Sequence, residues 1–191
     1  MNITFFDACK GTIAGGEDAL QFDRFICSQT IVMALEGVPA FYIHSLLGTP
    51  NDHEGVAKTE VNRAINRHRW DYPQLRELLE DGTTIHARTL NALKERIAIR
   101  TAHSPFNPNA TQFTMQLGDD IFGVWRQSRD RSQSIFAMHN VTDREVDVPL
   151  TSINLIDGEA WWDILTGQRI DAAAPSLHFA PYQCRWISNR P

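Results

Sequence analysis

Hydrophobic residues recur at helical spacing in two long stretches of the first half of the chain. The first stretch predicts a helix over residues 17–35, with one face made of Phe22, Phe25, Ile26, Gln29, Val32 and Met33. Glu17 and Asp18 lie in its first turn, where carboxylates favour the helix dipole, and Gly37 followed by Pro39 ends it. The second stretch predicts a helix over residues 84–102, and a shorter helix begins near Leu75.

The segment from Val38 to His44 is apolar without alternation. Such a run is typical of a central parallel strand that is covered by helices on both faces. A long helix that leads directly into a buried strand is an αβ step of a parallel sheet or barrel. Residues 2–6 are β-branched and aromatic and predict a second buried strand or extended arm.

The pattern changes after residue 105, where short alternating segments are separated by Gly, Pro and Asp turns. They predict strands near residues 113–117, 121–126, 134–139, 145–150, 161–165, 177–179 and 184–187. We therefore expect α/β plus all-β architecture, with a domain boundary between residues 105 and 106. A lone parallel strand has no partner for its hydrogen-bond ladder, so residues 1–105 are expected to be the last part of a larger α/β domain.

Composition excludes several classes of protein. The net charge is −5 and Lys and Arg form no stripe, which argues against a nucleic-acid partner. No apolar run approaches the ~20 residues of a membrane span, and the N-terminus lacks the pattern of a signal peptide. Cys9, Cys27 and Cys184 have no metal spacing and are expected to be buried free thiols, which favours the cytoplasm.

The usual cofactor motifs are missing, so we expect no cofactor. There is no Gly-rich dinucleotide or phosphate loop, no His-Glu-x-x-His, no Cys-x-x-Cys and no Gly-x-Ser-x-Gly. Polar residues gather instead in residues 45–72, directly after the predicted strand, where parallel folds place their sites. They are His44, Asp52, His53, Glu54, Arg63, Arg67 and His68.

Each of these residues has a functional and a structural interpretation. Three histidines and two acids could hold a metal, but their spacing fits no common ligand pattern, so we expect none. Asp52 and Glu54 could be an acid/base pair, although capping of a short helix over residues 55–61 is the preferred interpretation. Arg67 presents a rigid donor fork that suits sugar hydroxyls or a carboxylate, and equally suits a structural ion pair.

Trp161 and Trp162 in the β domain could form a sugar-stacking platform. Adjacent residues of a strand point to opposite faces, so at most one of them is exposed on each side. Packing in the core is the preferred interpretation for both, and also for Trp125 and Trp186.

Two motifs together resemble a known family. Residues 35–48, Leu-Glu-Gly-Val-Pro-Ala-Phe-Tyr-Ile-His-Ser-Leu-Leu-Gly, are similar to the eighth barrel strand of the sucrose phosphorylase and glucosylglycerate phosphorylase branch of the α-amylase clan. Asn51-Asp-His-Glu-Gly55 and Asn62-Arg-Ala-Ile-Asn-Arg-His68 follow in the order and spacing of that branch. Residues 2–8 and the β part also resemble this branch, so the resemblance covers essentially the whole chain.

The resemblance implies retaining α-glucosyl transfer from sucrose or a glucosylglycerate-like donor to inorganic phosphate. Such enzymes use a carboxylate nucleophile and a carboxyl acid/base. The resemblance places both, and a third acidic residue, on earlier barrel strands, so no catalytic residue is assigned here. Arg67 would hold the terminal glucose, and His68 and Asp52 would border that site. Residues 1–105 would be the end of a TIM barrel that needs about 250 residues to close.

Three hypotheses follow for the chain itself. It is the C-terminal portion of a phosphorylase, inactive alone; or a non-catalytic carbohydrate-binding module; or one half of a pair, complemented by a chain that supplies the missing barrel strands. We also expect self-association through the exposed faces of the 17–35 helix and the 38–44 segment.

Overall fold

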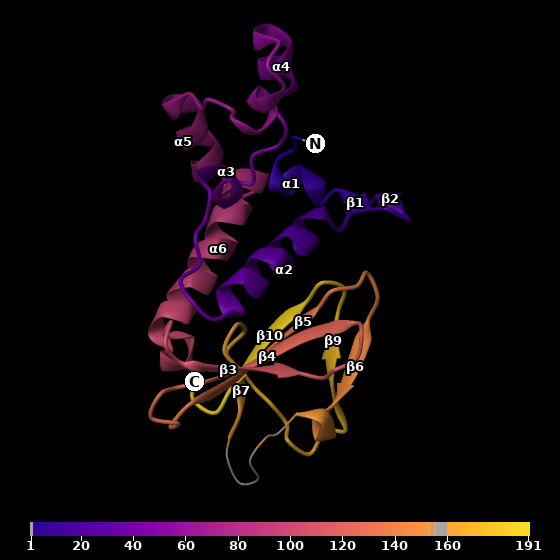
Figure 1. The fold of residues 1–191 in the computed structure, drawn as a ribbon, viewed down its shortest axis with the longest axis vertical. Helices are drawn as coiled ribbons and strands as arrows, with labels where there is room; N and C mark the ends of the chain where they lie inside the picture. The colour runs from indigo at the N-terminus through magenta and orange to yellow at the C-terminus, as the bar shows by residue number, and fades with distance from the viewer. Residues whose placement is uncertain (1, 154, 156–159) are drawn as a thin grey trace. The chain divides into compact units, whose positions relative to one another are not determined.

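The computed structural model describes residues 2–153, 155 and 160–191. Two compact units are present (Figure 1): the first comprises residues 1–26 and 40–95, and the second residues 27–39 and 96–191. These units are defined by contacts between residues in space. The predicted domain boundary between residues 105 and 106, which would separate a barrel portion from a β domain, stays a prediction. The regular elements of the described residues are α1 (Phe5–Ala8), β1 (Gly11–Thr12), β2 (Gly16–Glu17), α2 (Gln21–Ala34), α3 (Ile43–Leu46), α4 (His53–Thr59), η1 (Asn62–Asn66), α5 (Tyr72–Glu80), α6 (Ile85–Ala102), η2 (Ser104–Phe106), β3 (Thr111–Met115), β4 (Ile121–Gln127), β5 (Ser134–Asn140), β6 (Val146–Pro149), η3 (Leu150–Ser152), β7 (Trp162–Asp163), β8 (Gln168–Arg169), β9 (Ser176–Phe179) and β10 (Cys184–Ser188).

The two long helices confirm the periodicity of the sequence. The predicted helix over residues 84–102 is α6, and the one over residues 17–35 is the shorter α2. Glu17 belongs instead to the β1–β2 hairpin, in which it pairs with Gly11. A Cβ at Gly11 would collide with the Gly16 carbonyl, so this tight hairpin depends on a glycine there. Gly37 has a φ of 98°, the left-handed conformation that was predicted beyond the helix end.

The strand predicted over residues 38–44 is wrong. Residues 38–42 have no regular structure, and Ile43–Leu46 form the short helix α3. A strand is stabilised by ladder hydrogen bonds, and no strand of the described residues pairs with this segment. Composition alone therefore does not make it a strand in this chain.

The prediction of a strand or extended arm over residues 2–6 is also wrong at its end. Phe5 and Phe6 begin the helix α1, because the Thr4 hydroxyl accepts a hydrogen bond from the Asp7 amide at 3.2 Å and caps the first turn. Phe6 packs edge-on against Phe25 of α2, with ring centroids 5.1 Å apart. The aromatic pair thus packs α1 against the first part of α2.

The second unit is rich in antiparallel sheet. Six strands form one sheet in the order β3-β4-β5-β10-β7-β8, and β6 pairs with β9 in a separate ladder. One apolar cluster draws on both sheets, with Phe136 and Ile187 from the first and Val148 and Phe179 from the second. The predicted β segments are thereby confirmed in outline, with β7 reduced to Trp162–Asp163 and β8 added.

Core packing is confirmed for three of the tryptophans. Trp161 and Trp186 are 1% and 0% exposed, so neither offers a face to a sugar. Trp125 is half-buried and packs against the apolar cluster, and Trp162 is half-buried. The three cysteines are also buried and form no disulfide, as expected. Burial raises the pKa of the Cys184 thiol well above its ordinary value, which keeps it protonated.

Candidate functional site

The polar segment between α3 and α5 is organised around Asp52. Its carboxylate accepts a hydrogen bond from the Gly55 amide at 2.7 Å and so caps α4, which confirms the capping interpretation over an acid/base pair with Glu54. A Cβ at Gly55 would lie 2.5 Å from the Asp52 carboxylate, so the close approach favours glycine at this position. The Asp52 amide donates to the Ile65 carbonyl at 2.8 Å, which ties the start of α4 to η1.

Asp52 also holds His68. The second carboxylate oxygen lies 3.0 Å from Nδ1 of His68, and the His68 ring meets the Trp70 ring edge-on with centroids 4.5 Å apart. The Gly55 amide and, to a smaller extent, His68 keep the pKa of Asp52 below its ordinary value, so the carboxylate stays charged. The imidazole orientation is therefore fixed from two sides.

Neighbouring hydrogen bonds anchor this segment within the first unit. Asn51 accepts from the Thr4 amide at 2.8 Å, and its own amide donates to Asp7 at 2.9 Å. The Trp70 indole donates to the Thr49 hydroxyl at 3.2 Å. Hydrogen bonds thus anchor the segment that carries the Asn-Arg-His motif on both sides of the motif, at Asn51 and at Trp70.

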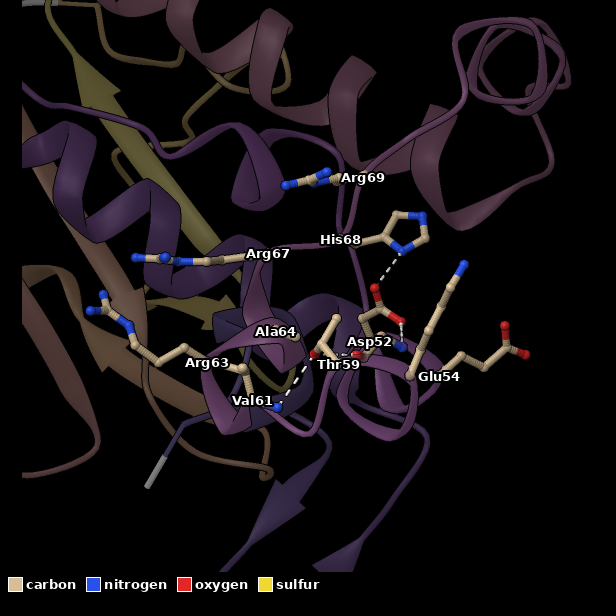
Figure 2. Close-up of a pocket in the computed structure, with 11 residues that line it drawn as sticks. Asp52, Glu54, Thr59, Val61, Arg63, Ala64, Arg67, His68 and Arg69 are labelled. Atoms are coloured by element: carbon tan, nitrogen blue, oxygen red, sulfur yellow. Dashed lines mark hydrogen bonds and ion pairs between the residues drawn. The ribbon is translucent and has the colours of Figure 1, made fainter.

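A pocket of about 580 Å³ opens beside the Asp52–His68 pair. It brings together all three predicted site residues, Asp52, His68 and Arg67 (Figure 2). The Arg67 side chain is exposed, and within the described residues it makes no hydrogen bond or ion pair, so the structural ion pair considered for it is not formed. Its donors are available to a ligand.

Of the other candidates, Glu54 and Arg63 also line this pocket, whereas His44 and His53 do not. His44 is buried and contacts the Thr49 hydroxyl at 3.2 Å, and burial, followed by the charge of His68, lowers its pKa. His53 lines a second pocket. Within the described ranges, no three His, Cys, Asp or Glu side chains are placed to hold a metal ion.

Two residues that the sequence did not single out also line the main pocket, Lys58 and Arg69. A signal for Arg69 was present, because it directly follows the Asn-Arg-His motif that ends at His68. Lys58 gave no signal, since a lysine in the last turn of α4 has an ordinary role at the helix C-terminus.

No protein-family profile matches the chain, but curated proteins do. A glucosylglycerate phosphorylase of Allomeiothermus silvanus is 31% identical over 97% of this chain and 30% of its own length. That of Escherichia coli K12 is 29% identical over 98% of this chain and 32% of its own. The sucrose phosphorylase of Agrobacterium vitis is 27% identical over 71% of this chain and 24% of its own.

The chain is a homologue of the glucosylglycerate and sucrose phosphorylases. The resemblance found in its motifs is confirmed. The chain spans about 30% of the length of the first of these relatives.

Solved structures with the same fold are α-amylase-family enzymes. AmyP bound to maltotriose superposes with a TM-score of 0.74 over 99% of this chain and 39% of its own, at 15% identity. A trehalulose synthase variant gives a TM-score of 0.63 over 91% of this chain and 40% of its own, at 13% identity. At such identities the likeness concerns the fold alone. Among the described residues, none of the helices has the length and apolarity that crossing a bilayer requires.

Proposed function

We propose that this phosphorylase homologue is the C-terminal portion of an α-glucoside phosphorylase. The complete enzyme would transfer glucose, with retention, from sucrose or a glucosylglycerate-like donor to inorganic phosphate in the cytoplasm. Residues 1–105 would be the end of its TIM barrel and residues 106–191 a β-sandwich domain. The observation that carries the proposal is the pocket in which Arg67 and His68, from the Asn-Arg-His motif of this branch, lie together with Asp52.

The chemistry assigns limited roles to these residues. Retaining transfer needs a nucleophilic carboxylate and an acid/base about 5–5.5 Å from it. Asp52 serves as neither, because its oxygens are engaged by the Gly55 amide and by His68. With Nδ1 facing Asp52, His68 presents Nε2 to a sugar hydroxyl, and Arg67 presents donors for the same ring. Both are binding residues, and bond cleavage would belong to the rest of the enzyme.

A chimeric enzyme tests the proposal. The matching segment of the E. coli relative is replaced by these 191 residues, and release of glucose 1-phosphate from glucosylglycerate or sucrose is measured in the presence of phosphate. We expect turnover by the chimera and none by the 191-residue chain alone. Arg67→Ala should lower kcat/KM about 100-fold, since hydrogen bonds from a charged donor contribute about 1.5–3 kcal/mol.

The matched control removes an arginine outside the pocket. Arg76 is exposed and paired with Glu80 within α5, so Arg76→Ala should leave turnover unchanged. A chimera that folds, as judged by circular dichroism, but turns over neither donor would contradict the proposal. Turnover by the 191-residue chain alone would also contradict it.

The alternative, a carbohydrate-binding module on the β domain, rested on the tryptophan pair. The burial of Trp161 leaves only the half-buried Trp162 for that role, and a single partly covered ring is a poor platform. The structure therefore favours the phosphorylase portion.

A further inference from the structure

The main pocket concentrates positive charge on an acidic protein. The chain carries a net charge of −5, yet Lys58, Arg63, Arg67 and Arg69 line this one pocket beside only two carboxylates, Asp52 and Glu54. Like charges gathered in a concave site repel one another and raise the local concentration of anions. An anionic ligand would offset this excess of positive charge.

Three of these cations share a direction. Figure 2 shows the side chains of Arg63, Arg67 and Arg69 extending to one side of the segment, while His68 extends to the other side toward Asp52. Arg63 comes from η1, and Arg67 and Arg69 follow directly after it. We call these three guanidinium groups the arginine face.

No carboxylate of the described residues neutralises the arginine face. Asp52 is engaged by the Gly55 amide and His68, and Glu54 extends away from the three arginines in Figure 2. All three arginines are exposed, and none forms an ion pair within the described ranges. Guanidinium groups hold carboxylate and phosphate oxygens through two parallel N–H donors. The class of ligand that suits the arginine face is therefore an oxyanion.

We propose that the arginine face binds an oxyanion of the substrate, with Arg63 and Arg69 reading the anion while Arg67 holds the sugar. The shared chemistry fits a carboxylate on the donor's aglycone or inorganic phosphate. The inference rests on the proposed function for the source of the anion, and it makes Arg63 and Arg69 specificity-determining residues. Where the anion is the aglycone's carboxylate, a donor that carries one would be preferred to neutral sucrose.

The test uses the 191-residue chain and follows arginine side-chain Nε–Hε resonances by NMR. D-glycerate and inorganic phosphate are titrated separately, with glycerol as the neutral control and glucose as the probe of the sugar site. We expect resonances of Arg63 and Arg69 to shift with one of the anions and not with glycerol. Whichever anion shifts them identifies the source.

Variants separate this face from charge in general. Arg63→Ala and Arg69→Ala should each weaken anion binding about tenfold, as expected for the loss of one charge-assisted contact. Arg76→Ala removes the same charge outside the pocket and should leave the affinity unchanged. Addition of salt should weaken binding, because exposed charges are screened.

Each outcome bears on the proposal. Shifts with neither anion, or equal weakening by Arg76→Ala, would overturn it and leave the guanidinium groups to carboxylates of a longer or partner polypeptide. Glucose binding that is lost in Arg67→Ala, without any anion binding, would refute the arginine face and keep the proposed function. Anion binding without glucose binding would support the arginine face, and turnover by the chimera then tests the proposed function separately.

Discussion

Asp52 combines two roles in one carboxylate, and substitution can separate them. Asp52→Ala removes both the cap of α4 and the partner of His68 and should destabilise this segment by about 1 kcal/mol. Asp52→Asn should cost only a few tenths of that, since asparagine caps helices as well as aspartate does. Hydrogen exchange at the Gly55 amide, the capped group, measures the difference, and equal exchange in the two variants would contradict the capping role.

The charge of Asp52 adds a dependence on pH with a definite sign. Its pKa is lower in the folded chain than the ordinary value of about 3.9. The stabilisation is therefore complete above that ordinary value and is lost as the pH falls through the lower folded one. Protection of the Gly55 amide should decline over this acid range in the wild-type chain and stay level in Asp52→Asn.

His139 predicts a second dependence on pH, in the β-rich unit. Its ring is fully buried in β5, with Nδ1 3.1 Å from the Phe122 carbonyl, and burial lowers its pKa to about 4. The unfolded chain, with a pKa near 6.5, binds the proton more readily. Stability is therefore full above about pH 6.5 and falls as the pH drops toward 4, by at most about 3 kcal/mol.

Urea unfolding at pH 7 and pH 5 measures this loss. His139→Gln should flatten the profile, with a residual slope from His44 and His103, whose pKa values are also lowered by burial. The control is His178→Gln, which makes the same substitution at an exposed position. A wild-type stability that stays constant between these pH values would refute the role of His139.

At the scale of elements, hydrophobic periodicity predicted the helices and strands whose conformation depends on their own sequence and apolar faces. The helix α6 and the strands β4 and β5 match the sequence pattern closely, because their apolar faces find partners within the chain. The segment 38–44 has the composition of a buried strand, but a ladder partner cannot be read from composition. The Thr4 cap likewise turned Phe5 and Phe6 into a helix.

The same distinction applies to the site. The resemblance to the phosphorylase branch implied Arg67, His68 and Asp52 as site residues, and the capping pattern predicted the structural role of Asp52 correctly. The common direction of Arg63, Arg67 and Arg69 depends on the path of the chain through and after η1, which spacing alone does not specify. The helix cap made by Asp52 was thus predictable from local sequence, whereas the shared direction of the exposed arginine side chains was not.

The unpaired segment should be visible in hydrogen exchange. Within the described residues, the amides of Val38, Ala40, Phe41 and Tyr42 have no hydrogen-bond acceptor, whereas β5 is paired on both sides by β4 and β10. We expect the former to exchange near the rate of an unfolded chain and β5 to be protected until global opening. Equal protection of the two would show that the segment finds a ladder partner in solution.

At the scale of the whole molecule, the chain spans about 30% of the length of its A. silvanus relative, and it exposes apolar residues in and beside the segment between α2 and α3. Val38, Tyr42 and Ile43 are 80%, 55% and 53% exposed. Unpaired backbone beside exposed apolar side chains is a template for association between chains. We therefore expect the isolated chain to self-associate as its concentration rises.

Sedimentation velocity tests this expectation against a matched surface change. The double substitution Val38→Ser and Tyr42→Ser should lower the concentration dependence of the sedimentation coefficient. Tyr72→Ser should not, although Tyr72 is 75% exposed, because it lies at the start of α5, whose backbone is already hydrogen-bonded. If the Tyr72 variant behaves like the double variant, exposed apolar area in general drives association. If the concentration dependence falls only in the double variant, association depends on the segment 38–42, whose side chains are typical of a strand and whose backbone pairs with no strand of the described residues.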